Sequence, residues 1–211
     1  VDENAVEITK KRIKEISGYE SDNIICTDFL GQKSKAKSQK FDYIFTNPPW
    51  GKKINKVDRL RYSSLYNSGN SIDTSALFYF ACLKMLKEDG KIGMLMPDSF
   101  FNITAFEDAR KSLLTLNISR LVDYGKPFKG LMTKAMAFVA SKVNSQRSML
   151  NSQIECEIYN VKKHLRSQEG FLKVPKHIFN FHIEEKENDI IRQVYSLPHI
   201  TLKDNAEWAL G

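Results

Sequence analysis

The sequence is poor in the residues that build disulfide frameworks and metal centres. Its three cysteines, Cys26, Cys82 and Cys156, are far apart, and its four histidines form no cluster near them. This excludes a disulfide scaffold and a zinc site with paired ligands, and it is typical of a reducing cytosol. Because the cysteines stand in apolar surroundings, we expect all three to be buried, with no metal bound.

Long apolar runs are also missing. No stretch of the 211 residues is apolar over the length that a bilayer requires, and the first residues lack the basic and then apolar pattern of a signal peptide. We therefore expect a cytoplasmic protein without a membrane partner.

Positive charge is in surplus. The formal net charge is +7, which favours a polyanionic partner such as nucleic acid, although a cationic surface also serves solubility. With 42% hydrophobic and 27% charged residues, the chain has the composition of a globular domain.

Helical and strand patterns alternate along much of the chain. Helices are expected at residues 2–18, 74–87 and 105–116, and strands at residues 23–26, 41–46, 91–96, 118–124 and 135–141. Residues 31–40 read as a lysine- and serine-rich loop. This order predicts an α/β fold with a mostly parallel sheet and helices on both faces.

The sharpest signal is the tetrapeptide Asn-Pro-Pro-Trp at residues 47–50, directly after the strand expected at 41–46. Neither proline can donate a ladder hydrogen bond, so the strand has to end there. Both prolines have a fixed φ and disfavour a helical residue before them, which makes the turn stiff. The Asn47 side chain and the Pro48 carbonyl can then point outward at the carboxyl edge of the sheet, where open α/β folds bind ligands.

Two aligned acceptors suit chemistry at an amino group conjugated to a ring. The lone pair of such an amine is delocalised, and acceptors on its two N–H bonds favour the geometry that frees it for a methyl sulfonium carbon. Asn47 and Pro48 would act as these prearranged dipoles, and Trp50 would offer a flat face to the base. Flipping a base costs roughly a few kcal/mol and one aromatic stack returns about 1–3 kcal/mol, so we expect a second aromatic clamp.

The tetrapeptide resembles the Asn/Asp-Pro-Pro-aromatic signature of amino-group methyltransferases. The surrounding segments are similar, in order, to adenine-N6 DNA methyltransferases of restriction-modification systems as far as residue 141. The resemblance implies a Rossmann-like methyltransferase fold, S-adenosyl-L-methionine as cofactor, double-stranded DNA as partner and N6 of a flipped adenine as acceptor. It implies that Asn47, Pro48, Pro49 and Trp50 are the catalytic residues.

The resemblance also assigns cofactor and base contacts. Asp28 resembles the acid that receives the adenine amino group of the cofactor, with Phe29 beside it, and Phe78 resembles the aromatic that lies against that adenine. Asn47 would contact the cofactor as well. Phe128 resembles the aromatic that packs the flipped base on its other side. A turn cap for Asp28 and core packing for Phe78 and Phe128 are the structural alternatives.

Several cations follow the tetrapeptide. Lys52, Lys53 and Lys56, with Arg59 and Arg61, either contact DNA phosphates around the flipped nucleotide or form a solvated loop.

The sequence departs from the family in two respects. The glycine-rich turn of the first cofactor motif does not occur, and Asp2 is expected to cap a helix and not to bind the ribose. We therefore expect a fragment, truncated in its N-terminal cofactor half and inactive alone. It would comprise a partial catalytic core at 1–141, a polar linker at 142–153, and an extension at 154–211 that leads to an absent target-recognition domain.

In the extension we expect a strand, an extended stretch around Pro175 and a helix from about Glu184 to Tyr195. Two other functions stay open. The same tetrapeptide occurs in methyltransferases of RNA guanine-N2 and of protein glutamine, and the chain could also be a catalytically inactive nucleic-acid-binding fragment.

Overall fold

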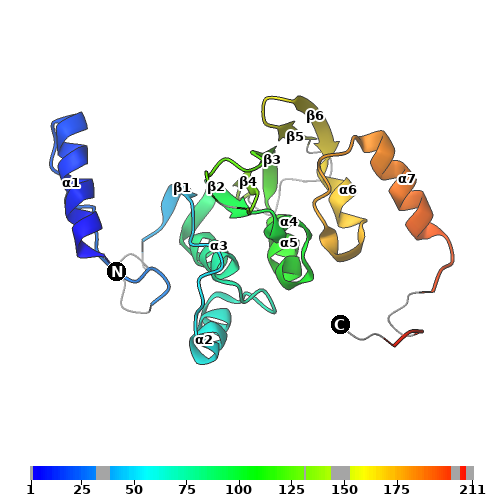
Figure 1. The fold of residues 1–211 in the computed structure, drawn as a ribbon, viewed down its shortest axis with the longest axis horizontal. Helices are drawn as coiled ribbons and strands as arrows, with labels where there is room; N and C mark the ends of the chain where they lie inside the picture. The colour runs from blue at the N-terminus through cyan, green and yellow to red at the C-terminus, as the bar shows by residue number, and fades with distance from the viewer. Residues whose placement is uncertain (1, 32–38, 131, 144–152, 201–204, 208–211) are drawn as a thin grey trace. The chain divides into compact units, whose positions relative to one another are not determined.

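A computed structural model of the chain describes residues 2–31, 39–130, 132–143, 153–200 and 205–207 (Figure 1). The chain divides into two compact units, Val1–Lys40 and Phe41–Gly211. Most of the loop expected at residues 31–40, and most of the expected linker at 142–153, lie outside the described residues.

The first unit contains the helix α1 (Glu3–Ser17). The Asp2 side chain accepts the Ala5 N–H at 3.1 Å, and Gly18 ends the helix with a left-handed φ of 75°. This confirms the helix and the capping role of Asp2. The prediction of a strand at residues 23–26 is wrong. A strand needs a neighbouring strand to pair with, and the described residues of this unit contain no strand.

Two of the three cysteines are buried as expected. Burial raises the pKa of the Cys82 thiol and of the Cys156 thiol to about 12. Cys26 is exposed, contrary to the expectation, because the segment that carries it does not join a sheet.

The second unit is built on a six-stranded sheet with the order β1-β2-β4-β3-β5-β6. The strands are β1 (Phe41–Thr46), β2 (Leu86–Pro97), β3 (Asn117–Asp123), β4 (Ala135–Ser141), β5 (Gln153–Ile158) and β6 (Lys162–Ser167). Four of the six strands, β1, β2, β3 and β5, share one direction, and β4 and β6 oppose them. The predicted α/β class with a mostly parallel sheet is confirmed.

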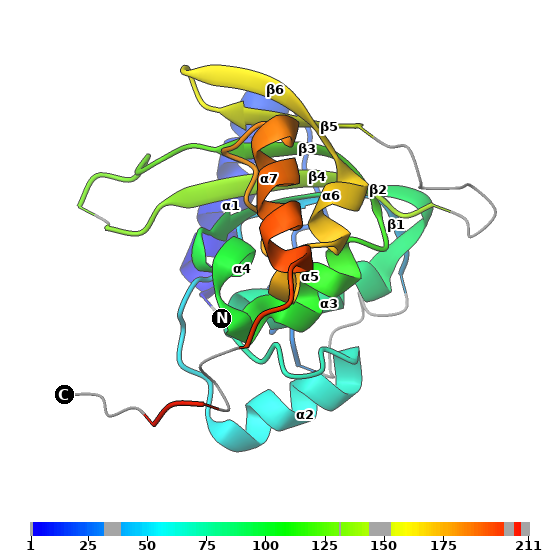
Figure 2. The same cartoon turned by 90° about the vertical axis from the view of Figure 1, so that its right-hand side faces the viewer.

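The helices of the second unit lie on one side of this sheet, with α2 packed against α3 and not against the strands (Figure 2). They are α2 (Lys56–Tyr66), α3 (Thr74–Met85), α4 (Ser99–Asn102), α5 (Glu107–Leu113), α6 (Gln168–Leu172) and α7 (Glu185–Ser196), with short 3₁₀ turns η2 (Thr104–Phe106) and η3 (Pro175–His177). α3 is buried on most sides, and the Tyr79 ring packs against Phe100 and Phe138 at 5.8 and 5.9 Å.

The expectation that helices cover both faces of the sheet needs correction for the described part of this unit. The crossovers from β1 to β2 and from β2 to β3 advance in the same direction along the sheet. Because such crossovers are right-handed, both place their helices on the same face. On the opposite face, Phe45 is exposed and Leu95 and Val139 are partly exposed.

Some boundaries differ from the expected ones. α3 ends at Met85, two residues before the expected end at Lys87, because the residues from Leu86 onward already pair with β1. The helix expected at 105–116 is shortened to η2 and α5, and the stretch around Pro175 forms η3. α2, β6 and α6 were not expected.

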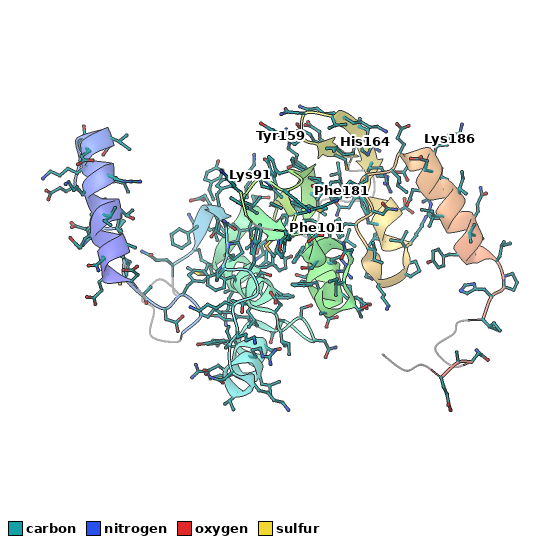
Figure 3. The ribbon with its side chains drawn as sticks, viewed as in Figure 1. Lys91, Phe101, Tyr159, His164, Phe181 and Lys186 are labelled. Carbon is teal, nitrogen blue, oxygen red and sulfur yellow. The ribbon has the colours of Figure 1, made fainter. Side chains whose placement is uncertain are left out.

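The segment after residue 170 is part of the same core. The Phe101 ring packs against Phe181 and Phe179 at 5.9 and 6.1 Å, and the Phe179 N–H donates to the Phe101 carbonyl at 2.9 Å. Figure 3 shows Phe101 and Phe181 close together although 80 residues separate them in the sequence. Since β5 and β6 also continue the sheet, residues 153–181 belong structurally to the core.

A fully buried arginine, Arg110, links this segment to the residues around α4. Arg110 donates to the carbonyls of Phe100 and Ile103 at 2.8 Å and to those of Lys176 and His177 at 3.0 Å. One guanidinium therefore satisfies carbonyls from two parts of the chain that are far apart in the sequence.

We expect Arg110→Ala to lower the free energy of unfolding by about 3 kcal/mol or more, because it leaves several buried carbonyls unpaired. Urea unfolding followed by circular dichroism measures this. The neighbouring Lys111, whose exposed side chain pairs with Glu107 at 3.0 Å, is the control, and Lys111→Ala should leave stability nearly unchanged. Equal effects of the two substitutions would contradict the role assigned to Arg110.

Candidate functional site

The Asn-Pro-Pro-Trp turn lies at the carboxyl end of β1, as the sequence predicts. β1 pairs in parallel with β2 up to Thr46, which is opposite Met94. In the turn, Pro48 is buried while Asn47 and Pro49 are exposed. Within the described residues no protein group hydrogen-bonds the Asn47 side chain, so its amide oxygen is available as an acceptor at the sheet edge.

Trp50 folds back over the neighbouring strand. Its indole N–H donates to the Leu95 carbonyl of β2 at 3.3 Å, and its ring is half-buried. The Phe128 ring, from the loop between β3 and β4, meets it edge to face, with centroids 6.0 Å apart and planes at 69°. The structure thus brings together the two aromatic residues that the sequence proposes as the clamp.

This edge-to-face contact closes the space between the two rings. A base held between them requires parallel ring faces, so one ring has to turn. The contact is worth about 0.5–1.5 kcal/mol beyond its burial, whereas each base–aromatic stack is worth about 1–3 kcal/mol. Exchanging one contact for two stacks is therefore favourable.

An apolar groove extends from Phe128 over the face of the sheet on which no described helix of the second unit lies. It is lined by Phe45, Thr46, Gly93, Met94, Leu95, Tyr124, Pro127, Phe128, Ala137, Phe138 and Val139. Gly93 lets the Phe45 ring lie close to β2, since a Cβ there would lie 2.5 Å from that ring. Phe45 and Tyr124 are lining residues that were not expected from the sequence. The alternation of Phe41, Tyr43 and Phe45 along one strand was the available signal.

The cations after the turn occupy two kinds of position. Lys52 and Lys53 are exposed, and the Thr74 hydroxyl donates to the Lys52 carbonyl at 2.5 Å, which ties this segment to α3. A second, polar groove is lined by Lys52, Lys53 and Arg59 together with the Asp73 carboxylate.

The remaining cations lie on a helix and not in the expected loop. Lys56 is the first residue of α2, and Arg59 and Arg61 follow on it. Arg61 pairs with Asp58 at 2.9 Å, so its charge is largely compensated. The Asn55 side chain caps α2 by accepting the Asp58 N–H at 2.8 Å, a signal that the lysine-rich surroundings obscured.

The residues proposed for the cofactor are on two units. In the first unit Asp28 is exposed, its carboxylate accepts the Leu30 N–H at 3.2 Å, and Phe29 is half-buried. In the second unit Phe78 is half-buried on α3. These residue types suit the binding of an adenosyl group. The Asp28 carboxylate can accept further hydrogen bonds from N–H groups, and part of the Phe78 ring is accessible for packing.

A buried carboxylate fixes the base of the loop that carries Phe128. Asp123, the last residue of β3, accepts the Gly125 N–H at 2.7 Å and lies 2.7 Å from His182 Nε2. The Asp123 carbonyl also accepts the Tyr159 N–H at 2.9 Å. Asp123 therefore ties the loop to β5 and to the segment that precedes α7.

Among the described residues, no three histidine, cysteine, aspartate or glutamate side chains lie together as metal ligands would. No helix in this part of the chain has the length and apolar character to cross a membrane.

The sheet and the turn at the end of β1 define the class: a mixed α/β protein with a Rossmann-like methyltransferase fold. The sequence model of the Eco57I restriction-modification methylases matches residues 1–129, and the chain belongs to this family.

Among curated proteins, the type II methyltransferase M.VspI of Vibrio sp. (strain 343) is 43% identical over 213 residues. The match covers 100% of this chain and 50% of that protein, so the chain spans about half the length of this relative.

Among solved structures, the DrdV–DNA complex shares the fold with a TM-score of 0.56 at 13% identity, over 84% of this chain and 23% of that one. The methyltransferase subunit of a type I restriction-modification system from Streptococcus thermophilus matches 80% of this chain and 34% of its own at 16% identity, with a TM-score of 0.47.

We expect Phe128→Ala to expose the Trp50 indole, because it removes the ring that covers one edge. In a Trp208→Phe background, in which Trp50 is the remaining tryptophan, emission should shift to longer wavelength and acrylamide quenching should increase. Phe41→Ala, at the other end of β1 and similarly exposed, should change neither. An unaltered spectrum for Phe128→Ala would show that the two rings do not touch in solution.

Proposed function

We propose that this chain is part of the catalytic domain of an S-adenosylmethionine-dependent DNA methyltransferase that methylates N6 of an adenine flipped out of the duplex. The observation that carries the proposal is the turn after β1. The Asn47 side chain accepts and donates no hydrogen bond within the described residues and lies at the carboxyl edge of the sheet, and the ring centroids of Trp50 and Phe128 are 6.0 Å apart. Membership of a restriction-modification methylase family supports DNA as the substrate.

In the proposed mechanism the chain positions the acceptor and excludes water. The Asn47 amide oxygen and the Pro48 carbonyl accept the two N–H bonds of the target amine, which withdraws its lone pair from the ring. Trp50 and Phe128 hold the base between them once their edge-to-face contact has opened. The prolines keep both acceptors in place, so little reorganisation accompanies the reaction.

Asp28, Phe29 and Phe78, with Asn47, would hold the cofactor, which supplies the methyl group on a sulfonium. Asp28 would accept the amino group of its adenine, and Phe78 would pack against the ring. Lys52, Lys53 and Lys56 would contact phosphates and set the register of the DNA without reading its sequence. A target-recognition domain, in the same or another chain, would select the site.

In the full-length natural protein, we expect Asn47→Ala to lower kcat for methyl transfer to DNA by roughly 100- to 1000-fold, because one of the two prearranged acceptors is lost. DNA binding and the melting temperature should change little. Transfer of labelled methyl groups to separate DNA, RNA and protein acceptors measures the first effect and tests the acceptor class.

Asn102→Ala, which truncates an exposed asparagine on α4, is the control and should retain full activity. Undiminished methylation by Asn47→Ala would refute the proposed role of the turn. Methyl transfer to RNA or protein in place of DNA would refute the proposed substrate while leaving the chemistry intact.

A second experiment tests the lysines. Replacing Lys52 and Lys53 by glutamine should reduce the slope of log K against log salt for DNA binding by about 1.8, because two phosphate contacts are lost. Lys186→Gln, which removes an exposed lysine on α7, should leave the slope unchanged. If the slope of the double variant equals that of the natural protein, these lysines do not contact phosphate.

A further inference from the structure

Two tyrosines form an exposed aromatic pair that the proposed mechanism does not use. Tyr124 follows β3 and Tyr159 lies in the turn between β5 and β6, and their ring centroids are 5.2 Å apart with planes tilted by 46°. Tyr124 is 38% exposed and Tyr159 is 50% exposed. Two adjacent aromatic rings that remain this accessible are an informative exception to the burial of large apolar groups.

The pair stands on the edge of the sheet that carries the candidate active site. β1, β3 and β5 run in the same direction, so Trp50, Tyr124 and Tyr159 all follow carboxyl ends of strands. Figure 2 shows the loop after β3 and the turn between β5 and β6 projecting from the same edge, and Figure 3 shows Tyr159 at that turn. Tyr124 also lines the groove that contains Phe128.

The pair is nevertheless separate from the Trp50–Phe128 clamp. The Trp50 indole lies over β2, and β2 and β5 are three strand positions apart in the sheet, which corresponds to about 14 Å at the usual spacing of strands. One base cannot contact Trp50 and Tyr159 together. The aromatic surface of the edge is therefore long enough for more than one base.

The charge around the pair suits a polyanion. Residues 124–134, which join β3 to β4, contain Lys126, Lys129 and Lys134 and no acidic residue. Of the two buried carboxylates near the pair, Glu157 is paired with Arg120, and Asp123 is hydrogen-bonded to His182 and to the Gly125 N–H. Cations beside accessible aromatic faces are the combination that binds unpaired nucleic acid strands.

The position of the pair is also fixed by the backbone. The Tyr159 N–H donates to the Asp123 carbonyl at 2.9 Å, and Tyr124 N–H donates to the Ala135 carbonyl at 2.9 Å. The two rings are thus presented by strand ends that are bonded to their neighbours, and binding a planar ligand requires little ordering of the backbone.

We propose that Tyr124 and Tyr159 form a second nucleobase-stacking site, which binds an unpaired base of the DNA strand outside the pocket for the target adenine. This inference rests on the proposed function, because it takes DNA as the substrate. The rings supply stacking with no base preference, and the lysines of residues 124–134 attract the adjoining phosphates.

The test compares two single-stranded probes with the full-length natural protein: a fluorescein-labelled oligomer of twelve deoxyadenosines, and an abasic oligomer with the same phosphates. Tyr159→Leu keeps an apolar side chain and removes the aromatic face. We expect it to weaken binding of the deoxyadenosine oligomer about tenfold and to leave binding of the abasic oligomer unchanged. Tyr159→Phe should bind both probes like the natural protein.

Tyr195→Leu is the matched control, since Tyr195 is also 50% exposed but lies on α7, and it should change neither affinity. Equal weakening for both probes, or no weakening for either, overturns the proposal. Asn47→Ala distinguishes the second stacking site from the proposed function. If Asn47→Ala abolishes methylation and leaves probe binding unchanged, both the proposed function and the second site are supported. If Asn47→Ala methylates normally while Tyr159→Leu weakens probe binding, the second site is supported and the proposed function is not.

If Tyr159→Leu does not fold, as judged by circular dichroism, the natural protein itself provides the test. A single-stranded oligomer that contains 5-bromodeoxyuridine is irradiated in complex with it, and the crosslinked peptides are identified by mass spectrometry. Crosslinks at Tyr124 or Tyr159 support the second site. Crosslinks confined to Trp50 and Phe128 overturn it.

Discussion

The antiparallel insertion of β4 between β2 and β3 is the constraint on which the candidate site depends. β4 pairs with β2 from Lys91↔Ser141 to Pro97↔Ala135 and with β3 from Asn117↔Ser141 to Asp123↔Met136. A strand that runs against its two neighbours begins at the edge where they end. The chain between β3 and β4 therefore cannot leave that edge, and Phe128 is held within reach of Trp50, which lies nearly 80 residues earlier in the sequence.

The local part of this arrangement could be predicted from the sequence, and the long-range part could not. The turn at residues 47–50 is determined by two prolines after an apolar strand, so its position and stiffness follow from local sterics. The helix α1 follows in the same way from Asp2 and Gly18. The proximity of Phe128 to Trp50 came from a resemblance, because no spacing along the chain encodes the insertion of β4.

Other differences have the same origin. The side of the sheet that the helices cover depends on strand order and crossover handedness, which a list of elements does not contain. α2 was hidden because its polar surface resembles a solvated loop, although Asn55 marked its start. The role of Arg110 was invisible, since its four carbonyl partners come from residues 100–103 and 176–177 and an arginine on a short helix is ordinarily exposed.

The continuity of the sheet past β4 bears on how the core can be recombined with other modules. Because β5 pairs with β3 and the buried Arg166 is bonded to Glu185 and to the Asn180 and Ile183 carbonyls, residues 153–185 are woven into the same framework. A chimaera joined within residues 142–153 would exchange β5, β6 and the Phe179 and Phe181 rings that pack against Phe101. Junctions placed beyond α7 leave that framework whole, so the folded framework continues well past the polar stretch at residues 142–153.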